Sequence, residues 1–125
     1  MTSESEYANH LRNALAPLGD IRVRRMFGGA GLFLEDTMFG LISEDSLFLK
    51  ADDENRPDFE AEGLQPITYE RLGRTIALSY WEAPEHLLDD PDALLRWSRR
   101  AWQAARRSAA GKSKRRRPKR KAQRK

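Results

Sequence analysis

A glycine-rich stretch between two apolar clusters is the feature that most constrains how this chain folds. Residues 26–34 read Met-Phe-Gly-Gly-Ala-Gly-Leu-Phe-Leu, with three glycines in four positions. Glycine is favoured where the backbone takes a positive φ or where a neighbouring element passes too close for a side chain. A phosphate-binding loop needs a different glycine spacing and a helix directly after it, whereas an alternating strand pattern follows here. We therefore predict a bend or bulge beside a closely packed neighbour.

Length and cysteine content restrict the class of protein. A chain of 125 residues is long enough for one domain with a modest core. It has no cysteine, which excludes disulfides, thiolate catalysis and cysteine-type zinc sites. No apolar run approaches the ~20 residues that a membrane span needs, and the polar, acidic N-terminus is not typical of a signal peptide. We expect a cytoplasmic protein without a membrane span.

The hydrophobic periodicity predicts a mixture of helices and strands. Apolar residues from Tyr7 to Leu18 recur at helical spacing, and Pro17 and Gly19 end that helix. The strands are expected at residues 21–27, 32–34, 38–42, 47–50, 67–72 and 74–81, the first of them weakened by its arginines. Short acidic links favour a meander for the middle strands, and Gly73 favours a hairpin for the last two.

Two further helices follow from turn and capping signals. A short helix should carry Phe59 inward, with Asp52 or Asp53 as its N-cap and Gly63 at its end. It requires Pro57 in its first turn. A helical turn is expected at residues 84–88, and the last helix should begin at Asp90 or Pro91 and run to about residue 110.

This order of elements predicts the fold class. We expect a two-layer α+β fold, with an antiparallel sheet of about five strands and helices on one face, in the order α-β-β-β-α-β-β-α. The predicted domain covers residues 1–110, and residues 111–125 are predicted to be a disordered basic tail.

The last predicted helix is strongly amphipathic. At 100° per residue, one half carries Leu94, Leu95, Trp97, Ser98, Ala101, Trp102, Ala104 and Ala105. The opposite arc carries Arg96, Arg99, Arg100, Arg106 and Arg107, with Gln103. The tryptophans are therefore expected to pack as core residues, and the arginines to face water.

The basic tail is the feature with the most direct physical consequence. Residues 111–125 hold ten Lys or Arg and no acid; removing these ten from the chain's 23 basic residues leaves 13 against 19 acidic ones, a formal charge of −6 for residues 1–110. Such a run binds polyanions by counterion release, without base specificity because it contains no aromatic residue. A solubility tail is the alternative. The candidate nucleic-acid-binding residues are Arg96, Arg99, Arg100, Arg106, Arg107, Lys112, Lys114, Arg115, Arg116, Arg117, Lys119, Arg120 and Lys121.

The chain resembles the TfoX N-terminal domain family over roughly residues 5–107. The resemblance rests on Arg-Met-Phe-Gly-Gly-Ala-Gly-Leu-Phe at 25–33, Met-Phe-Gly-Leu-Ile at 38–42, Leu-Phe-Leu-Lys-Ala-Asp at 47–52 and Tyr-Trp at 80–81 with Pro-Glu at 84–85. It implies a stand-alone, Sxy-like N-terminal domain with a small antiparallel sheet, and a bacterial regulator of competence or transcription. We expect the basic tail to take the place of the family's second, helical domain. The family motif residues Met26, Phe27, Gly28, Gly29, Gly31, Tyr80 and Trp81 are interpreted as structural.

The sequence contains no recognisable catalytic or metal-binding pattern. His10 and His86 have no ligand-like spacing, and the aspartates at 89, 90 and 92 are better explained as a helix entry. We therefore predict no catalytic, cofactor-binding or metal-binding residues and no cofactor, and a non-enzymatic regulatory or adaptor domain. Its partners would be DNA or RNA, bound non-specifically, and a protein on the acidic body. The alternative is a small-molecule or peptide-binding module with a groove beside residues 28–31 and an incidental tail.

Overall fold

A computed structural model describes residues 3–26, 28–44 and 46–116, with the backbone alone for residues 3–5 and 111–116. Two short 3₁₀ helices, η1 (Ala16–Leu18) and η2 (Glu85–Asp89), accompany the main elements. The helices and strands are α1 (Ser3–Ala14), β1 (Ile21–Met26), β2 (Gly29–Leu34), β3 (Thr37–Ser43), β4 (Ser46–Lys50), α2 (Arg56–Ala61), β5 (Pro66–Arg71), β6 (Arg74–Glu82) and α3 (Pro91–Arg116).

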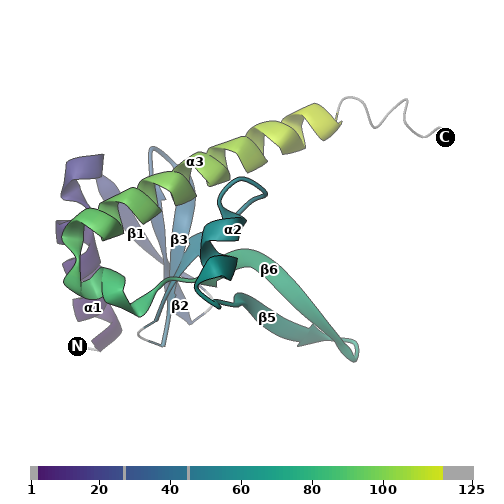
Figure 1. The fold of residues 1–125 in the computed structure, drawn as a ribbon, viewed down its shortest axis with the longest axis horizontal. Coiled ribbons are helices and arrows are strands. Elements are labelled where there is room, and N and C mark those ends of the chain that lie inside the picture. The colour runs from purple at the N-terminus through teal and green to yellow at the C-terminus, as the bar shows by residue number, and fades with distance from the viewer. Residues whose placement is uncertain (1–2, 27, 45, 117–125) are drawn as a thin grey trace.

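The strands form one open antiparallel sheet in the order β1-β2-β3-β4-β6-β5. The α+β prediction is confirmed, with six strands rather than about five, because the arginine-rich segment does form β1. The helix α3 packs against β3 and β4, and the β5–β6 hairpin projects away from the body (Figure 1). Packing of α1 and α3 onto the same side of the sheet leaves its other side without a helix in the described residues.

The core lies between the helices and the sheet. In β2 every second side chain points into it, so that Ala30, Leu32 and Leu34 are buried together. The other buried apolar side chains of this cluster are Ala8, Leu11, Leu15, Ile21, Phe39, Ile42, Leu47, Leu49, Ala51, Phe59, Leu87, Ala93, Leu94 and Ala101. The apolar side chains that follow the predicted helical and strand periodicities therefore lie together in one hydrophobic layer.

The glycine stretch packs against a close neighbour, as predicted. A Cβ added to Gly29 would lie 2.1 Å from the carbonyl oxygen of Ile42 on β3, which leaves room for hydrogen alone. Gly28 takes φ +76° in the turn before β2. The sheet also has a bulge, but it lies across from this stretch: Leu32 pairs with Gly40 and Phe33 with Met38, so that the extra residue belongs to β3.

Tight hairpin turns join the strands. Glu35 and Asp36, between β2 and β3, have φ of +51° and +65°. Leu72 and Gly73, between β5 and β6, have φ of +52° and +78°. Two successive positive φ values are typical of the type I′ turn, whose twist matches that of antiparallel strands.

Two predicted helix boundaries are wrong. The N-cap of α2 is Asn55 rather than Asp52 or Asp53, because Asp52 accepts hydrogen bonds from the backbone N–H groups of Glu54 and Asn55 at 3.0 and 3.4 Å and forms a turn before the helix. Pro57 lies in the first turn, as that helix requires.

The second wrong boundary is the end of α3, which is helical to Arg116 instead of about residue 110. A single glycine at 111 costs only about 1 kcal/mol in a helix, and alanine, lysine and arginine around it favour helix. The backbone of α3 thus includes residues 111–116, and the division into a domain at 1–110 and a disordered tail stays a prediction. The predicted tail residues 117–125 lie outside the described residues.

Candidate nucleic-acid interface

Helix α3 begins at a side-chain cap and is held to the body by its tryptophans. The side chain of Asp90 accepts a hydrogen bond from the backbone N–H of Ala93 at 3.1 Å. The ring of Trp97 meets Phe59 of α2 edge to face at 5.0 Å. The indole N–H of Trp102 donates to the carbonyl oxygen of Leu34 at 3.0 Å. These contacts fix which side of α3 faces the sheet and which side faces outward.

The same helix carries its basic end away from the body. Twenty-six residues give α3 a length of about 39 Å, and its C-terminal part extends past the sheet (Figure 1). The backbone of Lys112, Lys114, Arg115 and Arg116 lies on this extension. The candidates Arg117, Lys119, Arg120 and Lys121 lie outside the described residues.

Arg107 is joined to the loop before α2 rather than left to solvent. Its guanidinium donates to both carboxylate oxygens of Asp52, at 2.7 and 2.9 Å, and lies 3.3 Å from Glu54. The paired guanidinium holds the pKa of Asp52 below its usual value, and this hydrogen-bonded pair raises the pKa of Arg107. This bidentate pair is a structural link between α3 and the loop.

Two more arginines of α3 also meet acidic residues of the body. Arg100 forms an ion pair with Asp58 of α2. Arg106 lies over the ring of Trp102 at 5.0 Å and within 4.0 Å of Glu35. Of the five arginines predicted to bind nucleic acid on this helix, three therefore have an acidic partner.

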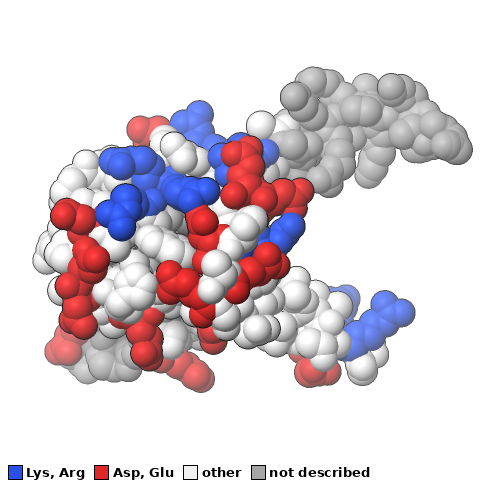
Figure 2. All heavy atoms as spheres, viewed as in Figure 1, with Lys and Arg blue, Asp and Glu red and all other residues white. Residues whose placement is uncertain are grey.

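Arg96 and Arg99 are different, because no ion pair with another described residue is found for either. Figure 2 shows the basic side chains along α3 bordered by acidic ones. The positive field of the helix is consequently weaker over the body than five arginines in a row suggest.

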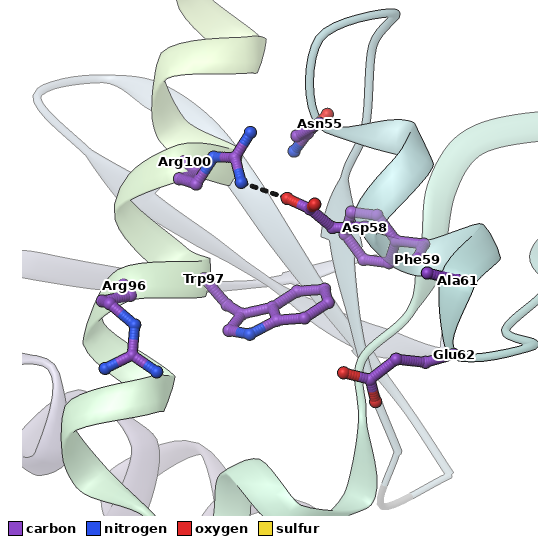
Figure 3. Close-up of a pocket in the computed structure, with 8 residues that line it drawn as sticks. All are labelled: Asn55, Asp58, Phe59, Ala61, Glu62, Arg96, Trp97 and Arg100. Atoms are coloured by element: carbon purple, nitrogen blue, oxygen red, sulfur yellow. Dashed lines mark hydrogen bonds and ion pairs between the residues drawn. The ribbon is translucent and has the colours of Figure 1, made fainter.

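A pocket of about 390 Å³ lies between α2 and α3 (Figure 3). Phe59 and Trp97 line it, and its charged residues are two cations, Arg96 and Arg100, and two carboxylates, Asp58 and Glu62. The ion pair between Arg100 and Asp58 lies across one end. The equal numbers of opposite charges give this pocket no strong preference for an anion.

A larger groove of about 630 Å³ opens on the side of the sheet that lacks helices. It lies beside Gly29 and Met26, and β3 and the β5–β6 hairpin supply the rest of its lining. Its wall includes Tyr69 and Leu78, which are 44% and 38% exposed. The sequence predicted a groove beside residues 28–31, but only the fold shows that the hairpin, some 40 residues further on, forms its other wall.

The remaining family motif residues hold the sheet together. The hydroxyl of Tyr80 donates to the carbonyl oxygen of Met38 at 3.1 Å, and burial raises the pKa of Tyr80 to about 12. Trp81 packs against Phe59 with ring centroids 6.0 Å apart. Gly31 lies under side chains of β1 and β3, and Phe27 lies outside the described residues.

The described residues show no metal-binding cluster and no membrane-spanning helix. In the part of the chain that the structure describes, no group of three or more His, Asp or Glu could hold a metal ion. His86 lies 3.3 Å from Glu62, and His10 is exposed on α1. None of the described helices is both long and apolar enough to cross a membrane.

Comparison with known proteins places this fold in a family. Residues 13–105 match the model of the TfoX N-terminal domain. Protein Sxy of Escherichia coli K12 is 32% identical over 91 residues, which is 73% of this chain and 44% of that protein. The DNA transformation protein TfoX1 of Aliivibrio fischeri is 31% identical over 83 residues, 66% of this chain and 40% of that protein.

The chain thus spans less than half the length of these two relatives. The family model, by contrast, covers most of the chain, from within α1 to within α3, and includes the glycine stretch and all six strands. The chain therefore belongs to the TfoX N-terminal domain family.

Proposed function

We propose that this chain is a non-enzymatic regulatory or adaptor domain that holds nucleic acid electrostatically through α3 and the basic residues that follow it. The observation that supports this is the geometry of α3, which extends from an acidic body and carries its basic end away from it. Residues 1–110 have a formal charge of −6, so that a polyanion is repelled by the body and attracted to this extension.

Two further cations of α3 add to the same interface. Arg96 and Arg99 have no ion pair within the described part of the chain, whereas Arg100 and Arg107 would have to leave Asp58 and Asp52 to contact phosphates. Contacts of this kind release counterions and do not read bases, so the binding is non-specific and weakens as salt rises.

The two relatives suggest the setting of this activity. One is named a DNA transformation protein, and both are bacterial. We propose a competence or transcription regulator-like role in the cytoplasm. There the acidic body would contact a protein while α3 and the basic segment hold nucleic acid.

Fluorescence anisotropy with a labelled DNA duplex tests this proposal. We would compare the native chain with a variant in which Lys112, Lys114, Arg115 and Arg116 are glutamine, over about 50 to 300 mM salt. Loss of most of the affinity and a shallower salt dependence are expected, because four phosphate contacts are removed. Equal binding by the two proteins at moderate salt, with unchanged circular dichroism, would contradict the proposal.

A further inference from the structure

The side of the sheet opposite the helices carries a set of apolar and aromatic residues that the core does not use. Strand pairing places them together: Gly31 pairs with Leu41, Leu41 with Phe48, and Phe33 with Met38. We call this surface the helix-free face. Its apolar residues are Met26, Phe33, Met38, Leu41, Phe48, Ile67, Tyr69, Ile76, Leu78 and Tyr80.

Gly31 makes room for the aromatic part of this surface. A Cβ at Gly31 would lie 2.8 Å from the sulfur of Met38, 3.1 Å from Cε1 of Phe33 and 3.3 Å from the sulfur of Met26. These side chains therefore lie down across the sheet instead of standing away from it. Together with the 630 Å³ groove beside Tyr69, they form a shallow apolar platform.

The charge of the helix-free face is opposite to that of the rest of the body. Its strands bear the cations Arg22, Arg24, Lys50, Arg71 and Arg74. Among its described strand residues there is one acid, Glu82, whose carboxylate already accepts the backbone N–H of Gln65 at 3.2 Å. Arg22 lies on the edge strand β1, and its Nε is 3.8 Å from a carboxylate oxygen of the exposed Asp20. The face as a whole is positive in a body whose formal charge is −6.

Two of these cations lie over aromatic rings. The guanidinium of Arg24 is 5.5 Å from the centre of the Phe33 ring, and the ammonium of Lys50 is 5.3 Å from that of Tyr80. A nucleotide presents a flat ring and a phosphate to a protein, and an aromatic side chain with a neighbouring cation is complementary to both.

We propose that the helix-free face binds single-stranded nucleic acid, with bases stacked on its aromatic side chains and phosphates held by its cations. Tyr69 is the most accessible of these rings, and Arg71 and Arg74 follow it at the end of the hairpin. Duplex DNA does not fit this platform, because its bases are already stacked and paired. An apolar peptide would cover the groove but would bring no anion to the cations of this face.

This site is separate from α3, and the two can be tested independently in the full chain. The probes are a fluorescein-labelled oligothymidine and an oligouridine of about twelve nucleotides, and a duplex of the same length. The variant Tyr69→Ala removes a ring that is 44% exposed. Its matched control is Leu88→Ala, which removes a side chain of the same exposure from η2.

We expect Tyr69→Ala to weaken binding of the single strands about tenfold and to leave duplex binding unchanged, since stacking energy is lost and charge is not. Leu88→Ala should change neither. Oligothymidine and oligouridine distinguish DNA from RNA as the source of the strand. Equal losses for duplex and single strand, or no loss for either single strand, would overturn the proposal.

A charge-matched pair of double variants gives the second arm. Arg71→Gln with Arg74→Gln should weaken single-strand binding more than Arg96→Gln with Arg99→Gln, which removes the same charge from α3. If the α3 double variant instead lost more single-strand affinity than the hairpin double variant, the proposed site on the sheet would be wrong, and binding through α3 would still stand. Loss of duplex binding in the variant Arg96→Gln with Arg99→Gln would support the function proposed for α3 and would leave the proposed site on the sheet unchanged.

Discussion

On the helix-covered side of the sheet three arginines of α3 meet carboxylates, whereas on the helix-free face two cations lie over aromatic rings. Arg107 and Arg100 are paired with Asp52 and Asp58, while Arg24 is stacked on Phe33. A carboxylate neutralises a cation, but an aromatic ring leaves its charge available to an anion. A row of arginines in the sequence is therefore a poor guide to where the molecule is positive.

The two sides can be compared most sharply at the glycines of β2. A Cβ on Gly29 meets the backbone of β3 at 2.1 Å, and backbone cannot move without breaking the sheet. The Cβ on Gly31 meets the sulfur of Met38, the flexible end of a side chain, at 2.8 Å. We expect Gly29→Ala to reduce the free energy of unfolding by about 3 kcal/mol or more, and Gly31→Ala by about 1 kcal/mol.

Urea unfolding followed by tryptophan fluorescence measures both values. If the two variants lost the same stability, the close approach of β2 and β3 at Gly29 would not be the constraint that the structure indicates. Gly31→Ala also disturbs the platform, so that it should weaken single-strand binding while the protein stays folded.

The ion pair between Arg107 and Asp52 predicts a pH-dependent contribution to stability. The pKa of Asp52 is lower in the folded protein than its ordinary value of 3.8, so the stabilisation is present above about pH 4 and is lost as pH falls through the folded pKa. Arg107→Gln should cost about 1–2 kcal/mol at pH 7, a value reduced by partial solvent exposure of the pair.

Urea unfolding of the native protein and of this variant at neutral and acidic pH measures that difference. We expect the two stabilities to converge below the folded pKa of Asp52. A difference that stayed constant over the whole range would show that Arg107 stabilises α3 by packing alone. Arg99→Gln, on the same helix without an ion pair among the described residues, is the control.

The smallest predicted effect lies on the buried side of α3. The hydroxyl of Ser98 is fully buried and has no hydrogen-bond partner among the described residues. Removal of an unpaired polar atom from a core is favourable, so Ser98→Ala should raise the free energy of unfolding by up to about 1 kcal/mol. Thermal unfolding measures it, and a loss of stability would show that the hydroxyl has a partner in solution.

Local patterns in the sequence accounted for most of the fold. Three correctly predicted features depend on residues that are close in the chain. They are the alternation of core-facing side chains in β2, the helical spacing of apolar residues around Trp97, and the position of Pro57 in the first turn of α2. Boundaries were less predictable: α3 continues to Arg116 because a single glycine is a weak helix breaker within good helix formers. The strand β1 forms although it carries three arginines, because one of its edges pairs with β2 over its whole length.

The candidate sites were less predictable than the fold. The arginine row of α3 could be read from a helical wheel, but not its partners, since Arg107 and Asp52 are 55 residues apart and Arg100 and Asp58 are 42 apart. The five cations of the helix-free face come from four different strands, β1, β4, β5 and β6. No window of the sequence contains them together.

The sequence by itself determined the order of elements, the glycine positions that bring β2 against β3, and membership of the TfoX N-terminal domain family. Each of these follows from short-range periodicity, from backbone freedom or from a local motif. Only the tertiary structure decided which charges are neutralised and which remain available. Ion pairs and strand register join residues that are distant in the chain, and electrostatic interactions depend on distance in space rather than on separation in sequence.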